Sequence, residues 1–422
     1  MKRYLTLLAV LWLYACAKEP LYIPCKLPEC SDTITIKKEG LELKWQKSLR
    51  LDNNYSPRNR ILITEKNISF LYDYIENEKV LFIDKKDTLI STRFSSNTGG
   101  IMNVFYHKEV GLIIVDYKSV FTGYDAASMK KIASAPEGMQ FGALYTLFGD
   151  DIYGRMRDEA NKRTIIFKLN VFTGELTEDK EVKDSECPEC ESIVVNVPSL
   201  FRLRNGDIFI IYNTLYVIKS QIEYERKIDA YLLKGEIKEL KWTSDKSSKG
   251  CYEASTVIYN DQFIILSDSI YSMDPYTSKI NWSKPVTTGL DGWAISNTKY
   301  IFKDNKIYVL NQGHFIEINA DNGLISYDSG ELFFQQSNSA LTYFDGIFYW
   351  TAAQGGISWI FGLRASDKKV VLKMKSPNQG KAPYYNDTNY DWNGLQIDPE
   401  ARLGYTADGF FAQCFRIPES YE

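Results

Sequence analysis

The chain has 422 residues, with 50 Lys and Arg against 54 Asp and Glu, and its formal net charge is −4. A mildly acidic chain without Lys/Arg clusters is not suited to nucleic acid, because phosphate binding needs concentrated positive charge. It has only two histidines, His107 and His314, which leaves few bases for nucleophilic catalysis and few ligands for a zinc site.

The first residues predict export from the cytoplasm. Lys2 and Arg3 precede an apolar stretch from Leu5 to Leu13. This stretch is about half as long as the ~20 residues that cross a bilayer, so it is too short to be a stable transmembrane anchor. Elsewhere the sequence has no apolar run long enough to span a membrane.

The segment Leu13-Tyr14-Ala15-Cys16 resembles the lipobox of bacterial lipoproteins. The resemblance implies cleavage before Cys16, lipidation of its thiol and a membrane anchor of several acyl chains. We therefore expect a signal peptide over residues 1–15, a tether over 16–38 and a folded domain over 39–422, at the outer membrane of a bacterial cell envelope. The alternative is an ordinary secretory signal with a chance cysteine. Loss of residues 1–15 changes the net charge to −6.

Downstream of the signal, the sequence predicts an all-β protein. The full chain has 29 Tyr and 22 Phe, and downstream of the signal it consists of short segments rich in Ile, Val, Tyr, Phe and Thr, the composition of strands. No long segment has helical periodicity, and no Pro/Gly/Ser linker divides the chain.

A repeat runs along this part of the chain. In each unit one residue begins the turn that precedes the outermost strand. These residues are Asp84, Asp125, Asn170, Asp274, Asn319 and Arg364. They are separated in sequence by 41, 45, 104, 45 and 45 residues. The long gap holds one divergent unit, whose outer strand we place at Ile237 to Thr243 with Trp242. Four short strands at this period are typical of a propeller blade.

The two ends of the repeat region predict how the ring closes. Leu403 to Ile417 supplies two strands without an outer one, whereas Leu41 to Leu49 is an orphan outer strand with Trp45 placed like Trp242 and Trp282. We expect these ends to pair in one blade, which removes exposed sheet edges. The prediction is a single β-propeller of about eight four-stranded blades, or seven if the divergent unit is an insertion. Two stacked β-sandwiches are the alternative, but they do not explain the period.

Three turn segments resemble the quinoprotein-like (PQQ-like) propeller repeat. They are Asp274 to Trp282, Asn170 to Leu176 and Asn319 to Ile325. The superfamily includes quinone-cofactor dehydrogenases, which commonly carry adjacent cysteines and a calcium site, and non-enzymatic envelope lipoproteins such as the propeller lipoprotein of the outer-membrane barrel assembly machinery. This chain has no Cys-Cys pair, so the resemblance favours the second branch, with no cofactor and no metal.

Six further cysteines suit an oxidising compartment and allow fifteen pairings. Cys25 and Cys30, and Cys187 and Cys190, are close enough in sequence for local disulfides, although links between the two pairs are also possible. The CPEC segment from Cys187 to Cys190 is open to a redox or zinc interpretation, and a structural disulfide is preferred.

A binding function is favoured over a catalytic one. We expect both histidines in solvent-facing turns, and the sequence contains neither a nucleophile elbow nor a phosphate-binding loop. Tyrosines and tryptophans in two blade-to-blade connections suggest a binding face, because such rings are enriched at interfaces. An alternative is that they pack between blades. The candidate residues are Asp291, Trp293, Tyr384, Tyr385, Tyr390, Asp391 and Trp392.

The resulting hypothesis is a lipid-anchored, non-catalytic module that binds a protein or a glycan at the cell envelope, as a monomer or within a hetero-complex. A carbohydrate-active or degenerate quinoprotein-type enzyme is the alternative, and a purely structural member of an outer-membrane assembly is a third possibility.

Overall fold

The computed structural model describes most of the chain from residue 40 onward. The described ranges are 40–48, 61–63, 67–72, 79–85, 90–95, 101–116, 120–124, 129–218, 224–235, 237–248, 255–266, 269–285, 300–311, 313–332, 339–354, 357–377, 394–407 and 411–421. Everything said below about the structure concerns these residues.

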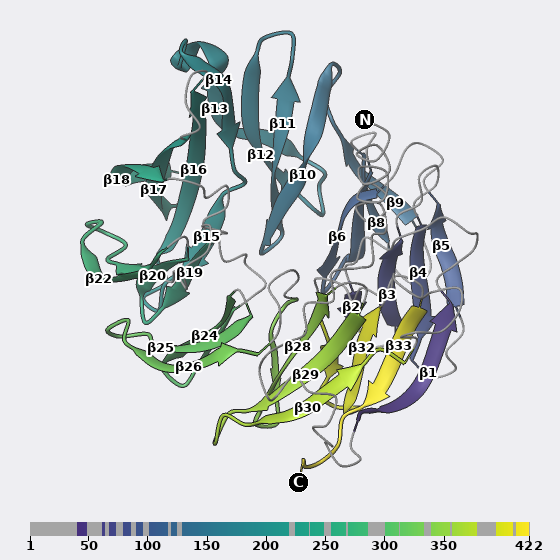
Figure 1. The fold of residues 1–422 in the computed structure, drawn as a ribbon. Coiled ribbons are helices and arrows are strands. Elements are labelled where there is room, and N and C mark those ends of the chain that lie inside the picture. The colour runs from purple at the N-terminus through teal and green to yellow at the C-terminus, as the bar shows by residue number, and fades with distance from the viewer. Residues whose placement is uncertain are drawn as a thin grey trace, which may run out of the picture.

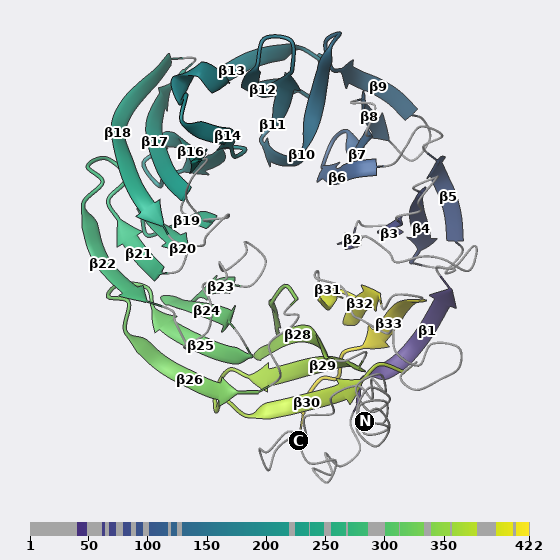
Figure 2. The same ribbon diagram turned by 45° about the horizontal axis from the view of Figure 1, so that its top comes forward.

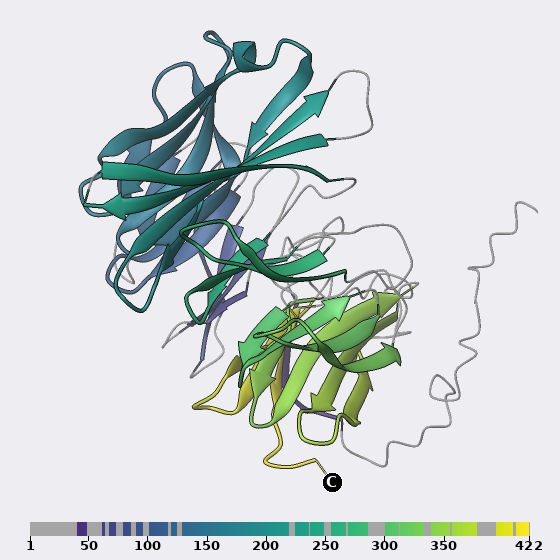
Figure 3. The same ribbon diagram turned by 90° about the vertical axis from the view of Figure 1, so that its left-hand side faces the viewer.

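The described strands form eight antiparallel sheets, seven with four strands and one with five. The sheets follow one another round a closed ring, as in a β-propeller (Figures 1 and 2). The teal sheets and the green to yellow sheets lie at opposite sides of this ring (Figure 3). The predicted propeller is therefore confirmed. We number the sheets as blades 1 to 8 in chain order.

Blades 1 to 3 use consecutive strands. They are β2 (Ile61–Ile63), β3 (Asn67–Tyr72), β4 (Lys79–Asp84) and β5 (Ile90–Ser95) in blade 1; β6 (Ile101–His107), β7 (Gly111–Asp116), β8 (Val120–Tyr124) and β9 (Met129–Ser134) in blade 2; and β10 (Met139–Phe148), β11 (Asp151–Asp158), β12 (Arg163–Asn170) and β13 (Leu176–Lys183) in blade 3.

Blade 4 follows a short 3-10 helix, η2 (Asp184–Glu186), and is the five-stranded sheet. Its strands are β14 (Cys190–Val195), β15 (Ser199–Arg202), β16 (Ile208–Ile218), β17 (Tyr224–Lys234) and β18 (Ile237–Ser248). Both β14 and β15 pair with the long β16, so together they take the place of one inner strand. The divergent unit of the sequence is thus a complete blade, and its outer strand β18 contains Trp242 as predicted.

Blades 5 to 7 match the three clearest sequence repeats. Their strands are β19 (Ser255–Tyr259), β20 (Gln262–Leu266), β21 (Ser269–Met273) and β22 (Ile280–Pro285); β23 (Tyr300–Lys303), β24 (Lys306–Asn311), β25 (His314–Asn319) and β26 (Ile325–Glu331); and β27 (Thr342–Phe344), β28 (Ile347–Gln354), β29 (Ile357–Arg364) and β30 (Val370–Lys375).

Blade 8 joins the two ends of the propeller. It contains β31 (Gln396–Asp398), β32 (Leu403–Ala407), β33 (Phe411–Arg416) and, as its outer strand, β1 (Glu42–Ser48). The β1 strand pairs antiparallel with β33 from Glu42 opposite Arg416 to Ser48 opposite Phe411. The purple β1 accordingly lies beside the yellow β33 in Figure 1. The predicted closure by an N-terminal strand in the last blade is confirmed.

A repeated turn explains the sequence period. In Asn170, Asp274 and Asn319 the side-chain Oδ1 accepts hydrogen bonds of 2.8–3.3 Å from the backbone N–H groups two and three residues further on. Asn and Asp favour turns because their short side chains can make these bonds. In all three blades the N–H four residues on then bonds to the carbonyl of the first residue. The turn between the third and outer strands is therefore encoded locally.

The hydrophobic core lies between neighbouring blades. Ile264 and Ile270 of blade 5, for example, pack in one buried cluster with Ile307, Val309 and Ile316 of blade 6. Similar clusters join blades 2 and 3, blades 6 and 7, and blades 8 and 1. Since each sheet buries both faces against its neighbours, the stability of a blade depends on the blades beside it.

Candidate functional site

The propeller has two distinct faces. The turns that join the first strand to the second and the third to the fourth lie at one end of each blade; we call this end the turn face. The turns between second and third strands and the blade-to-blade connections lie at the other end, the connection face.

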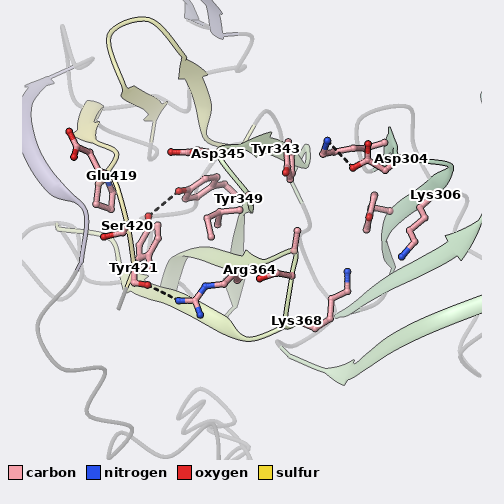
Figure 4. A pocket seen from close by; sticks show the side chains of 17 residues that line it. Asp304, Lys306, Tyr343, Asp345, Tyr349, Arg364, Lys368, Glu419, Ser420 and Tyr421 are labelled. Carbon is pink, nitrogen blue, oxygen red and sulfur yellow. Dashed lines mark hydrogen bonds and ion pairs between the residues drawn. The ribbon is translucent and has the colours of Figure 1, made fainter.

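A groove of about 550 Å³ opens on the turn face between blades 6 and 7. Its walls are the β23–β24 turn, the β27–β28 turn, the β29–β30 turn and the segment 418–421 that follows β33 (Figure 4). Turns belonging to two different blades and a segment that follows a third therefore meet at one place.

Four tyrosines line the groove. Tyr308 and Tyr349 are buried, with 5% and 1% of their surface exposed, whereas Tyr343 and Tyr421 are partly exposed. Burial raises the pKa of both Tyr308 and Tyr349 to about 12. These phenols therefore remain protonated at neutral pH and can donate hydrogen bonds.

A buried carboxylate holds two lysines at the floor of the groove. Glu317, on β25, is 2% exposed and forms ion pairs with both Lys306 of blade 6 and Lys368 of blade 7. Burial alone raises the pKa of Glu317, but hydrogen bonds from the two lysines and Ser326 outweigh it and lower the pKa to about 2. The charged triad therefore ties blade 6 to blade 7 beneath the groove.

The rim carries paired charges. Lys303 Nζ lies 2.9 Å from a carboxylate oxygen of Asp304 and 4.8 Å from the centre of the Tyr343 ring. Asp345, which also lines the groove, lies 2.8 Å from Nη2 of Arg402 in blade 8. An ion pair as exposed as that of Lys303 and Asp304 contributes little to stability, so either side chain can exchange its partner for a ligand.

The segment 418–421 is held along the groove by hydrogen bonds. Arg364 donates to the backbone carbonyl of Tyr421 at 2.6 Å, and the hydroxyls of Tyr349 and Tyr421 are 3.1 Å apart (Figure 4). Arg402 donates to the carbonyl of Pro418 at 2.7 Å. Arg364 and Tyr349 belong to blade 7 and Arg402 to blade 8, so the segment is bound to both blades and forms part of the groove wall.

The chemistry of the groove suits recognition of a polar, extended ligand. It offers aromatic surfaces from Tyr343 and Tyr421, hydroxyl donors and acceptors, and charges of both signs. Binding sites of several hundred Å³ commonly combine apolar walls with a few polar groups of this kind. Among the described residues, no group of three or more His, Cys, Asp or Glu side chains is arranged to hold a metal ion.

The expectation that His107 faces solvent is wrong. His107 is only 4% exposed, because the alternation of β6 turns Tyr106 outward and His107 inward. Its Nε2 lies 3.2 Å from Asp150, and its Nδ1 accepts the N–H of Val110 at 3.2 Å. The side chain thus links blade 2 to the β10–β11 turn of blade 3.

His314 is partly exposed at the start of β25, and its Nδ1 lies 2.8 Å from a carboxylate oxygen of Asp328. It belongs to blade 6 and His107 to blade 2, so the fold does not bring the two histidines into one site.

Cys187 and Cys190 are joined by a disulfide in the connection from blade 3 to blade 4, with their Cα atoms 5.3 Å apart. Both are buried against the hydrophobic cluster between these blades. Cys414 is a buried free thiol.

Cys16, Cys25 and Cys30 lie outside the described residues, as do all seven candidates for the binding face: Asp291, Trp293, Tyr384, Tyr385, Tyr390, Asp391 and Trp392.

The groove was not predicted from the sequence. Its residues come from turns about 40 residues apart and from the segment after the last strand. One sequence pattern does point to the groove, because Lys303-Asp304 and Tyr343 to Asp345 occupy the same turn in successive repeats.

No helix among the described residues has the length and apolar character needed to cross a membrane.

No protein-family model matches the chain, and no curated protein sequence does. Solved structures do match. BamB from Moraxella catarrhalis has a TM-score of 0.53 at 11% identity, over 89% of this chain and 100% of that one. The Dos1 propeller has a TM-score of 0.56 at 10% identity, over 90% and 99%. Sqt1 from Chaetomium thermophilum has a TM-score of 0.56 at 9% identity, over 86% and 96%. At such identities the likeness shows the β-propeller fold alone.

Proposed function

We propose that this protein is a non-catalytic binding module of the bacterial cell envelope, which is anchored through a lipid on Cys16 and binds a segment of a partner protein in the groove between blades 6 and 7. The observation that carries the proposal is the groove itself: about 550 Å³, lined by four tyrosines and by charges of both signs.

The lining favours a protein partner. Tyrosine and arginine are enriched where proteins bind each other, because they combine large contact area with hydrogen bonds. The lining carries Lys303 and Arg364 together with Asp304 and Asp345, so it matches a peptide that itself bears both charges. The neighbouring structures support a propeller scaffold, and the lipobox and turn motifs support an envelope lipoprotein of the quinoprotein-like superfamily.

A site-specific crosslink tests this proposal. A photoreactive phenylalanine derivative would replace Tyr343 in the full-length protein, and intact envelopes of the source bacterium would be irradiated. We expect one discrete adduct, whose partner peptide is identified by mass spectrometry. The Lys303→Glu substitution should remove this adduct, because it reverses one charge of the rim.

Blade 2 supplies a matched control. Tyr106 is the penultimate residue of the first strand of that blade, as Tyr343 is in blade 7, and it is 42% exposed. The exposed Lys108 follows two residues later, so this pair offers a tyrosine and a lysine on the same face outside the groove. The photoreactive residue at Tyr106 should give no such adduct, and Lys108→Glu should leave the Tyr343 adduct intact. Equal labelling from both positions contradicts the proposal. Binding of a purified glycan in place of a peptide would assign the groove to a carbohydrate.

A further inference from the structure

A second hollow lies on the connection face, between blades 3 and 4, and has a volume of about 390 Å³. Its lining includes Gln140 and Gly142 at the start of β10, Arg155 and Arg157 near the end of β11, and Asp184 after β13. It is separate from the groove, which opens on the other face between blades 6 and 7.

The two arginines of this hollow differ in their partners. Arg157 forms a two-pronged pair with Asp184, with N–O distances of 2.8 and 2.7 Å, and its Nε lies 3.3 Å from Glu159. Within the described part of the chain, Arg155 has no carboxylate partner and no hydrogen-bond acceptor. Burial lowers the pKa of Arg155, against a small opposing effect of Tyr145. Its guanidinium is thus a partly desolvated charge without a counter-ion.

The backbone beside Arg155 is shaped to accommodate the guanidinium. The pairing of β10 with β11 is interrupted by a bulge between Phe141 and Tyr145, which includes Gly142. A Cβ atom at Gly142 would lie 3.0 Å from Arg155 Nε, so glycine is the residue that leaves room for the side chain. The Arg155 guanidinium, which can donate two parallel hydrogen bonds, therefore lies at the wall of an open hollow.

The charges of the lining indicate which anion fits. Arg157 is neutralised by its ion pairs with Asp184 and Glu159, so the one positive charge of the lining without a counter-ion is that of Arg155. A monoanion neutralises this charge, whereas a dianion leaves an excess. Guanidinium also matches the planar geometry of a carboxylate, with two parallel N–H···O bonds. The buried Ile193 adds an apolar surface beside it.

We propose that Arg155 binds the carboxylate group of a small organic acid in the hollow between blades 3 and 4. The apolar part of the acid lies against Ile193, and Gln140 and Thr164 lie within the same lining to meet further polar atoms. This assignment does not depend on the proposed groove function, because it concerns other residues on the other face.

Equilibrium dialysis of the full-length protein against radiolabelled propionate tests the proposal, with inorganic phosphate as the competing class of anion. We expect one propionate per chain and at least tenfold weaker binding by Arg155→Gln. Arg204→Gln is the control, because Arg204 is exposed in the β15–β16 turn on the turn face, outside the hollow, and its loss changes the net charge equally. This variant should bind within twofold of the wild type.

Thermal unfolding separates a binding role from a structural one. The midpoint of the wild type should rise with propionate beyond the effect of sodium chloride at equal ionic strength, and that of Arg155→Gln should not. Without propionate, Arg155→Gln should unfold at the same temperature or higher, since it removes an unpaired buried charge. Equal propionate binding by wild type and Arg155→Gln overturns the proposal, and phosphate binding tenfold tighter than propionate overturns the carboxylate assignment.

Discussion

The indole N–H of Trp282, on the outer strand of blade 5, donates a 3.1 Å hydrogen bond to the carbonyl oxygen of Ala320 in blade 6. Trp242 of blade 4 makes the equivalent bond of 2.7 Å to Pro275 in blade 5. Ala320 and Pro275 occupy the same place, one residue after the Asn or Asp that opens the repeated turn. In both blades, therefore, a hydrogen bond from the outer-strand tryptophan joins the blade to the turn of the next one.

This contact predicts that Gly323→Ala is strongly destabilising. Gly323 lies in the turn below the indole with φ of 70°, and an added Cβ would come within 2.4 Å of Trp282 Cε3. The left-handed backbone costs an L-residue about 1–2 kcal/mol, and overpacking adds about 1–3 kcal/mol. We expect the free energy of unfolding to fall by about 3 kcal/mol in chemical denaturation.

Gly330→Ala is the control for backbone strain alone. Gly330 belongs to the same blade and has φ of 67°, but a Cβ there meets nothing within 4 Å. It should cost only about 1–2 kcal/mol. If both variants lose the same stability, the tryptophan contact does not hold the blades together.

Removal of the disulfide should lower the free energy of unfolding only modestly. Cys187 and Cys190 are three residues apart, so their bond closes a very short loop. Such a loop restricts the unfolded chain by about 2 kcal/mol. The Cys187→Ser/Cys190→Ser variant should lose about this much stability and no longer respond to a reducing agent. A loss above about 5 kcal/mol would mean that the thiols do more than close the loop.

The sequence predicted the blades because each turn is encoded locally. Asn170, Asp274 and Asn319 make their turns with neighbouring backbone groups, so their spacing reveals the repeat before any tertiary contact is known. The pairing of β1 with β33 was predictable for a related reason, since two incomplete units at the chain ends complete each other.

Long-range contacts explain what the sequence did not predict. His107 looked like a turn residue, yet its buried side chain contacts Asp150 of the next blade. Likewise, one wall of the groove is the segment 418–421, which Arg364 of blade 7 and Arg402 of blade 8 bind through its backbone carbonyls. No local pattern encodes such a contact.

Membrane anchoring is tested by Cys16→Ser. Cleavage and lipidation at a lipobox require the thiol, so this variant should lose its acyl chains. We expect wild-type protein in the detergent phase of a Triton X-114 partition and the variant in the aqueous phase. Cys414→Ser provides a comparison, because it removes a buried thiol of blade 8 and should leave partitioning unchanged. A variant at Cys16 that stays with the membrane contradicts lipidation there.

The buried triad predicts a specific acid sensitivity. The pKa of Glu317 falls from an ordinary 4.5 to about 2 in the folded protein, so its contribution is complete above pH 4.5 and disappears as the pH falls toward 2. Glu317→Gln should lower the free energy of unfolding by up to about 3 kcal/mol at pH 7, and this difference should vanish near pH 2. Glu331→Gln, at an exposed carboxylate of the same blade, should follow the wild type at every pH. A Glu317→Gln deficit that persists unchanged at pH 2 would mean that the ion pairs with Lys306 and Lys368 are not its source.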